Sequence, residues 1–267
     1  LDARQDVFTH YLDQDDWDLF FGVFMSTDRV NHFLFGDYAT DGEYKQDFLD
    51  FYRKLDGYIG EIRDSLDDDT TLIVASDHGF TRLEWEANCN EFLADEGWLS
   101  YETDDHDSLE DIDDDTRAYS LIPGRFYLNL EGREPEGVVP ESEYEAVRDE
   151  LKSMLEALEG PDGRKVADRV VEKETAFRGD HDDIAPDLVV VPNHGFDLKS
   201  GFKGKDEIFH GDGPRNGMHS FDNASLFVDD ADVSIGSDVD LYDIAPTILD
   251  LLEIDFSRAE FDGGSLV

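Results

Sequence analysis

The stretch Thr70-Thr71-Leu72-Ile73-Val74-Ala75-Ser76-Asp77-His78-Gly79 decides the fold of this chain. Its short run of aliphatic residues predicts a buried strand. An aspartate and a histidine follow the run directly, so two polar side chains come after the carboxyl end of the strand. Strands of this kind are typical of open α/β sheets, in which ligands bind outside the carboxyl ends.

Two segments upstream extend this prediction. Residues 19–25 read as another continuous buried strand, followed by a loop that carries Asp28 and His32. Between Tyr44 and Leu66 the apolar residues recur at helical spacing. The order of strand, helix and strand therefore predicts a doubly wound α/β/α sandwich with an incomplete sheet.

Three short motifs carry the candidate chemistry. They are Asp28-Arg29-Val30-Asn31-His32, Ser76-Asp77-His78-Gly79 and Gly217-Met218-His219. Together they offer two carboxylates and three imidazoles, which form a ligand set for Zn²⁺ or Mn²⁺. Two such ions roughly 4 Å apart stabilise the attacking and leaving oxygens of a phosphoryl displacement. The motifs therefore predict a hydrolase of phosphate esters that uses two divalent metal ions.

The remaining pattern divides the chain into three parts. We expect residues 1–117 to form the core α/β part that carries most of the metal ligands, and 118–205 to form an α+β insert or cap. Residues 206–267 are expected to return to the core with the last ligand and a C-terminal helix over Leu241 to Leu252. Pro246 fits the first turn of that helix.

Charge is the outlying property of the composition. The 267 residues include 67 acidic and 22 basic ones, which gives a formal net charge of −45. A surface of this kind repels nucleic acid and anionic membranes. It suits a protein that stays soluble in concentrated salt, so we expect a halophilic source and a cytoplasmic location in a high-salt cell, with any export signal upstream of Leu1.

Two further features exclude classes of protein. The single cysteine, Cys89, permits no intrachain disulfide and no cysteine-rich zinc module. The apolar runs are far shorter than the roughly 20 residues that span a bilayer. We therefore expect neither a membrane segment nor a nucleic-acid-binding surface, and the sequence leaves the oligomeric state open.

The ordered motifs resemble the alkaline phosphatase superfamily, and within it the type I phosphodiesterase/nucleotide pyrophosphatase branch. The resemblance spans nearly the whole chain. Further matching segments are Asn88-Cys89-Asn90-Glu91-Phe92-Leu93, Phe126-Tyr127-Leu128-Asn129-Leu130-Glu131-Gly132-Arg133, Pro186-Asp187-Leu188-Val189-Val190, Asp243-Ile244-Ala245-Pro246-Thr247-Ile248-Leu249 and Asp262-Gly263-Gly264-Ser265-Leu266.

The resemblance implies a role for each motif residue. Asp28, His32 and His219 would hold one metal ion, and Asp77 and His78 would hold the second. The family's Thr or Ser nucleophile, and one further Asp ligand, have no matching position here because the family places both ahead of Leu1. The resemblance thus implies a C-terminal portion that is inactive in isolation, whose complete enzyme forms a covalent phospho-enzyme on a small phosphate ester.

Three other residues are candidates for the substrate side. His210 and Arg215 precede His219 in a glycine-rich segment, and His194 lies in the predicted cap. Other interpretations remain open. A sulfatase or phosphomutase of the same superfamily would share the metal-binding scaffold, and the chain could instead be a non-catalytic metal-binding remnant. The leaving group and the preference between diester and monoester are not determined by the sequence.

Overall fold

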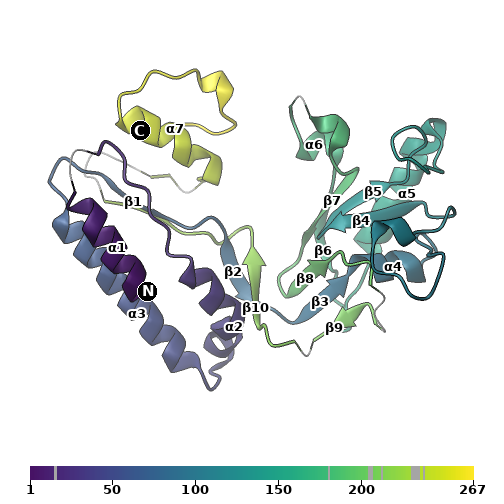
Figure 1. The fold of residues 1–267 in the computed structure, drawn as a ribbon, viewed down its shortest axis with the longest axis horizontal. Helices are drawn as coiled ribbons and strands as arrows, with labels where there is room; N and C mark the ends of the chain where they lie inside the picture. Colours follow the sequence, from purple (N-terminus) through teal and green to yellow (C-terminus); the bar gives the residue numbers. More distant parts are fainter. Residues whose placement is uncertain (15–16, 180, 204–206, 212, 230–234, 237) are drawn as a thin grey trace. The chain divides into compact units, whose positions relative to one another are not determined.

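The computed structural model describes residues 1–14, 17–179, 181–203, 207–211, 213–229, 235–236 and 238–267. The chain divides into two compact units (Figure 1). Unit 1 comprises 1–81 and 219–267, and unit 2 comprises 82–218. Unit 2 thus contains the predicted insert 118–205 together with flanking residues that the sequence assigned to the core, and the expected boundary at 205–206 lies outside the described residues. No described helix is long and apolar enough to cross a membrane.

Unit 1 combines helices with short strands. Its elements are α1 (Asp2–Leu12), α2 (Ser26–Thr40), α3 (Lys45–Ser65), β1 (Leu72–Ala75), β2 (Gly79–Arg82), β10 (Gly217–Ser220), β11 (Leu226–Asp229), η4 (Leu241–Asp243), α7 (Ile244–Leu251) and η5 (Arg258–Glu260), where β2 and β10 each extend into unit 2. The predicted helix over 44–66 is confirmed as α3. The strand predicted at 70–76 is confirmed as the shorter β1.

The helices of unit 1 pack through a small aromatic core. The Phe48 ring of α3 stacks on Tyr38 of α2, with ring centroids 4.7 Å apart. The Asn31 amide of α2 donates a hydrogen bond of 2.7 Å to the Tyr52 hydroxyl of α3. These contacts fix α2, the helix that carries two of the candidate ligands, against the longest helix of the unit.

One sequence-based expectation about unit 1 is wrong. Residues 19–24 form no strand within the described part of the chain. Phe20 and Phe24 pack against Phe8 of α1 instead, while Phe21 is 79% exposed. Strand β1 pairs antiparallel with β11. An apolar run alone therefore specifies neither a strand nor the strand that lies alongside it.

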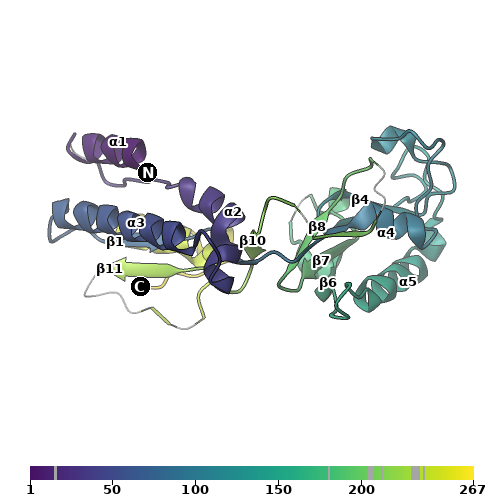
Figure 2. The ribbon, with the colours of Figure 1, turned by 90° about the horizontal axis from the view of Figure 1, so that it is seen from below.

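Unit 2 contains most of the buried apolar side chains. Its elements are β3 (Trp85–Asn88), α4 (Cys89–Asp95), η1 (Leu109–Asp111), β4 (Ala118–Ile122), β5 (Arg125–Leu128), η2 (Glu141–Glu143), α5 (Tyr144–Ala157), β6 (Ala167–Glu172), α6 (Lys173–Ala176), η3 (Asp182–Ile184), β7 (Leu188–Pro192), β8 (Phe196–Lys199) and β9 (Phe209–His210). The strand orders are β4-β5-β7-β6 and β8-β3-β9. Helix α5 packs on β6 and β7, and α4 packs on β4 (Figure 2). The α+β character predicted for this region is confirmed, and the chain as a whole is a mixed α/β protein.

The buried carboxylate of Asp187 links β5 to α5 and forms an ion pair with Arg133. The Asp187 side chain has no solvent exposure and receives hydrogen bonds of 2.8 and 2.7 Å from Arg133. The Tyr144 hydroxyl and the Leu128 N–H donate to the same carboxylate, each at 2.7 Å. Burial acts to raise the pKa of Asp187, but these donors hold that pKa below its ordinary value of 3.8. Unit 2 thus contains a carboxylate that is fully buried and accepts four hydrogen bonds.

Candidate metal centre

Asp28 and His32 lie on helix α2, which corrects the expectation that a loop carries them. The helix begins at Ser26, so Asp28 occupies its first turn, where a negative charge is favourable. The spacing of four residues puts both side chains on one face of the helix. As a result, His32 Nε2 lies 3.5 Å from Asp28 Oδ1.

His78 reaches the site because the chain turns at the end of β1. The Ser76 N–H donates to the Ser225 carbonyl at 2.9 Å, and the Ser225 N–H donates to Ser76 Oγ at 2.8 Å, which closes the β1–β11 ladder. The chain then leaves the ladder at Asp77 and His78 and continues as β2. His78 Nδ1 lies 3.1 Å from the Gly79 carbonyl, and a hydrogen bond there requires the proton on Nδ1. That tautomer leaves His78 Nε2 as the lone-pair nitrogen.

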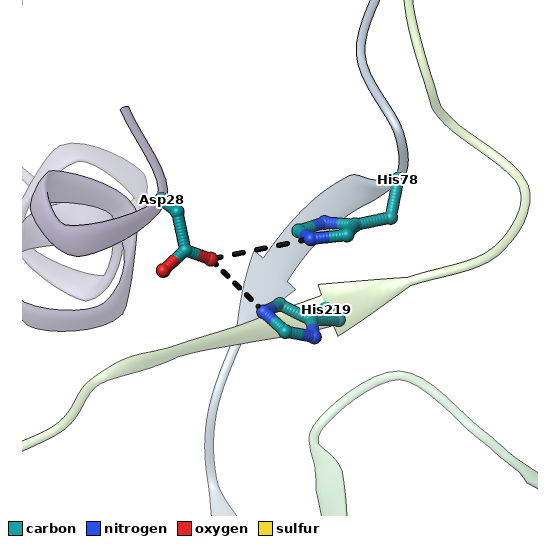
Figure 3. A group of neighbouring side chains, drawn as sticks. All are labelled: Asp28, His78 and His219. Carbon is teal, nitrogen blue, oxygen red and sulfur yellow. Dashed lines mark hydrogen bonds and ion pairs between the residues drawn. The ribbon is translucent and has the colours of Figure 1, made fainter. Parts of the chain in front are cut away.

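His219 comes from β10, which pairs with β2. This pairing brings His219 beside His78, with ring centroids 3.8 Å apart. His219 Nε2 lies 3.1 Å from Asp28 Oδ1, and His78 Nε2 lies 4.0 Å from the same oxygen (Figure 3). Asp28, His78 and His219 each offer a ligand atom within 4.8 Å of the other two.

The five predicted ligands therefore lie close together, although their exposure differs. His32 joins the three residues of Figure 3 through its 3.5 Å contact with Asp28, and its ring centroid lies 4.8 Å from that of His219. The Asp77 carboxylate lies 3.6 Å from His78 Nε2 but is 82% exposed. One carboxylate oxygen, Asp28 Oδ1, thus faces three imidazoles.

The electrostatics of the cluster suit a cation. Partial burial lowers the pKa of His219 below its ordinary 6.5, and the nearby His78 and His32 lower it further, while Asp28 acts in the opposite direction. The neutral imidazole is the form that binds metal. Neutral imidazoles around a carboxylate form the donor set of a zinc or manganese site, so the residues present fit a divalent ion.

Phe80, the first apolar residue of β2 after Gly79, supports the imidazoles. Its ring centroid lies 5.1 Å from those of His32 and His219, and 5.5 Å from that of His78. Phe80 is buried. The sequence does not distinguish this residue from other core positions, because a single phenylalanine in a strand carries no signal beyond burial.

The three predicted substrate residues belong to unit 2. Arg215 forms ion pairs with Glu86 and, at 3.4 Å, with Asp197, so two carboxylates already neutralise its guanidinium. The Nε2 atom of His210 is buried and has no hydrogen-bond partner among the described residues. The backbone carbonyl of His194 accepts a hydrogen bond from Arg164 at 3.1 Å. Their predicted role on the substrate side stays a prediction.

Comparison with known proteins places the chain in a family. No curated protein matches the chain, and no solved structure matches it. The family model described as type I phosphodiesterase / nucleotide pyrophosphatase matches residues 1–222, which include all five predicted ligands. This match covers well over half of the chain, and it agrees with the resemblance that the motifs indicated. The chain belongs to the type I phosphodiesterase / nucleotide pyrophosphatase family.

Proposed function

We propose that this protein is a metal-dependent hydrolase of phosphoric esters, of the phosphodiesterase or nucleotide pyrophosphatase type, with a small-molecule substrate. Family membership supports the class of reaction. The observation that carries the metal dependence is the position of Asp28 Oδ1, which faces three imidazole nitrogens at 3.1, 3.5 and 4.0 Å. A buried structural histidine needs one hydrogen-bond partner, whereas three imidazoles around one carboxylate oxygen are typical of a cation site.

The proposed ligands are those that the motifs predict. Asp28, His32 and His219 hold one divalent ion, and Asp77 with His78 holds the second, as Zn²⁺ or Mn²⁺. Bound divalent ions would neutralise the nonbridging oxygens of the phosphate and lower the pKa of the attacking hydroxyl. Because the Asp77 side chain is highly exposed, the second metal position is more accessible to solvent than the first.

The chain's own groups prepare this site. The bond between His78 Nδ1 and the Gly79 carbonyl orients the ring so that Nε2 faces Asp28. The lowered pKa of His219 keeps that imidazole neutral near pH 7. An attacking hydroxyl is not assigned among the neighbouring residues, because the Thr27 hydroxyl donates to the Phe24 carbonyl and Ser76 Oγ accepts from the Ser225 N–H. The nucleophile of a covalent phospho-enzyme is proposed to lie outside this sequence, so we expect metal binding but little hydrolysis from these 267 residues.

The test combines metal content with hydrolysis in concentrated salt. The chain is loaded with Zn²⁺ or Mn²⁺, dialysed and analysed for bound metal by mass spectrometry. The wild type is compared with His219→Ala and with His181→Ala, which removes an exposed histidine. Hydrolysis of bis-p-nitrophenyl phosphate and of p-nitrophenyl phosphate is measured on the same samples and on the longest natural form of the protein that can be expressed.

The two readouts separate the interpretations. We expect His219→Ala to lose bound metal and His181→Ala to retain it, with hydrolysis of the diester by the longest form. Equal metal content in the two variants would refute the proposed ligands. Metal binding without hydrolysis of either ester by any form would favour a non-catalytic metal-binding protein.

A further inference from the structure

The connection between β10 and β11 contains a side chain that joins β10, which carries His219, to β2, which begins directly after His78. The Asn223 side-chain amide donates a hydrogen bond of 2.9 Å to the Phe80 carbonyl in β2. The Ser220 hydroxyl, at the end of β10, donates to Asn223 Oδ1. Since a carbonyl accepts and cannot donate, the bond to Phe80 fixes which end of the carboxamide carries the nitrogen. Asn223 therefore bridges β2 and β10.

The bridged residues lie within two positions of two proposed ligands. Ser220 follows His219 in the chain and is only 2% exposed. Phe80 lies two residues after His78, and its ring contacts the rings of both histidines. A change in the separation of β2 and β10 at this point would therefore move the two imidazoles relative to each other.

The residue between His78 and Phe80 is a glycine for a steric reason. A side chain at Gly79 would overlap the Asn223 side-chain oxygen, and its Cβ would lie 2.8 Å from the Asn223 backbone carbonyl carbon. Even the smallest side chain would push Asn223 away from β2. The order Asp77-His78-Gly79 thus combines two proposed ligands with the close approach that the bridge requires.

We propose that Asn223 is a positioning residue for the metal centre: its carboxamide holds β2 and β10 at the separation that places His78 and His219 together. Ser220 acts with it by orienting the carboxamide. Asn223 is not itself a ligand, because its amide nitrogen and its oxygen are both engaged by β2 and β10. This inference rests on the proposed metal site, and it assigns the Asn223 side chain a role that the motif resemblance does not.

The experiment compares Asn223→Ala and Asn223→Asp with the control Phe221→Ala. Phe221 lies in the same connection, and its side chain is 69% exposed. The aspartate variant keeps the shape and the oxygen that Ser220 contacts, but it replaces the donor to the Phe80 carbonyl with an acceptor. Two quantities are measured on the full chain: the affinity for Co²⁺ with its visible absorption spectrum, and the ring proton shifts of ¹³C-labelled histidine without metal. The ring of Phe80 makes those shifts sensitive to the positions of His78 and His219.

We expect both Asn223 variants to bind Co²⁺ about tenfold more weakly, as is typical when a group that orients a ligand is lost. At saturating Co²⁺ their absorption spectrum differs from that of the wild type, and the metal-free shifts of His78 and His219 move. Phe221→Ala retains all three properties. A residue that only stabilises the fold would lower the unfolding temperature without altering the spectrum of the saturated site.

Each contrary result has a distinct meaning. Wild-type shifts together with wild-type affinity in the Asn223 variants would overturn the positioning role. If the wild type itself binds no Co²⁺, the proposed function fails, and the metal-free histidine shifts still decide whether Asn223 positions the rings. If Asn223→Ala does not fold, as judged by circular dichroism, Asn223→Asp and Ser220→Ala give the same comparison, and wild-type properties in both would refute the proposal.

Discussion

His219 Nε2 lies 3.1 Å from Asp28 Oδ1, although 191 positions separate the two residues in the sequence. The first turn of α2 supplies the carboxylate, and β10 supplies the imidazole. His32 and His78 face the same oxygen at 3.5 and 4.0 Å. The Asp28 carboxylate is therefore the common partner of the three histidines, and its removal tests the site most directly.

Asp28→Asn should weaken the binding of Zn²⁺ or Mn²⁺ by more than the roughly 10–100-fold that follows loss of a group supporting a ligand, because a charged ligand itself is lost. The amide keeps the size of the side chain, so the fold should be retained. Isothermal titration calorimetry measures the affinity. Asp56→Asn, an exposed position on α3, is the control and should bind metal as the wild type does. Similar affinities in the two variants would remove Asp28 from the site.

The local patterns predicted much of this site, for identifiable reasons. The run of aliphatic residues before Asp77 predicted β1, and the helical spacing after Tyr44 predicted α3. Both patterns are formed by residues that are close together in the sequence. The sequence did not place Asp28 on a helix, although Ser26 and an acidic first turn are signals of a helix start. The apolar residues at 19–25 suggested a strand, so the residues after them were interpreted as a loop and not as the first turn of a helix.

Contacts between distant segments could not be predicted in this way. Nothing near Arg215 in the sequence indicates that Glu86 and Asp197 neutralise it. Likewise, the pairing of β1 with β11 depends on where the chain returns after 150 residues or so of intervening structure, and strand propensity carries no information about partners. The hydrogen bonds of Asn223 to Phe80 and Ser220 could not be predicted from local patterns either.

Loss of one partner from the buried pair of Arg133 and Asp187 should strongly destabilise unit 2. Arg133→Met removes two hydrogen bonds from a carboxylate that has no solvent exposure, so we expect the free energy of unfolding to fall by about 3–5 kcal/mol. Urea unfolding followed by Trp fluorescence gives this value, because Trp98 is buried in the same unit. Arg169→Met, which removes an exposed pair with Asp168 at 3.7 Å, should change stability by no more than about 1 kcal/mol. Equal effects would contradict a special role for Arg133.

The same carboxylate predicts how stability responds to acid. The folded protein holds the pKa of Asp187 below the ordinary 3.8, so near that pH the unfolded state binds more protons than the folded state. The stabilisation is therefore complete above about pH 4 to 5 and is lost as the pH falls through the lowered value. The measurement is the urea concentration at the midpoint of unfolding, taken between pH 6 and pH 2. At pH 6 this midpoint should be well below the wild-type value for Asp187→Asn, and the difference between the two proteins should shrink as the pH falls. A difference that is independent of pH would mean that the carboxylate charge contributes nothing.

The net charge of −45 predicts a strong dependence on salt. Folding brings the excess carboxylates closer together than they are in the unfolded chain, so their repulsion opposes the compact state. Raising KCl from about 0.1 M to about 1 M shortens the screening length from about 10 Å to about 3 Å, and it should raise the unfolding temperature. An uncharged osmolyte at equal osmolality serves as the control, because it does not screen charge. If both cosolutes raise the unfolding temperature equally, screening is not the cause and the proposed adaptation to high salt is wrong.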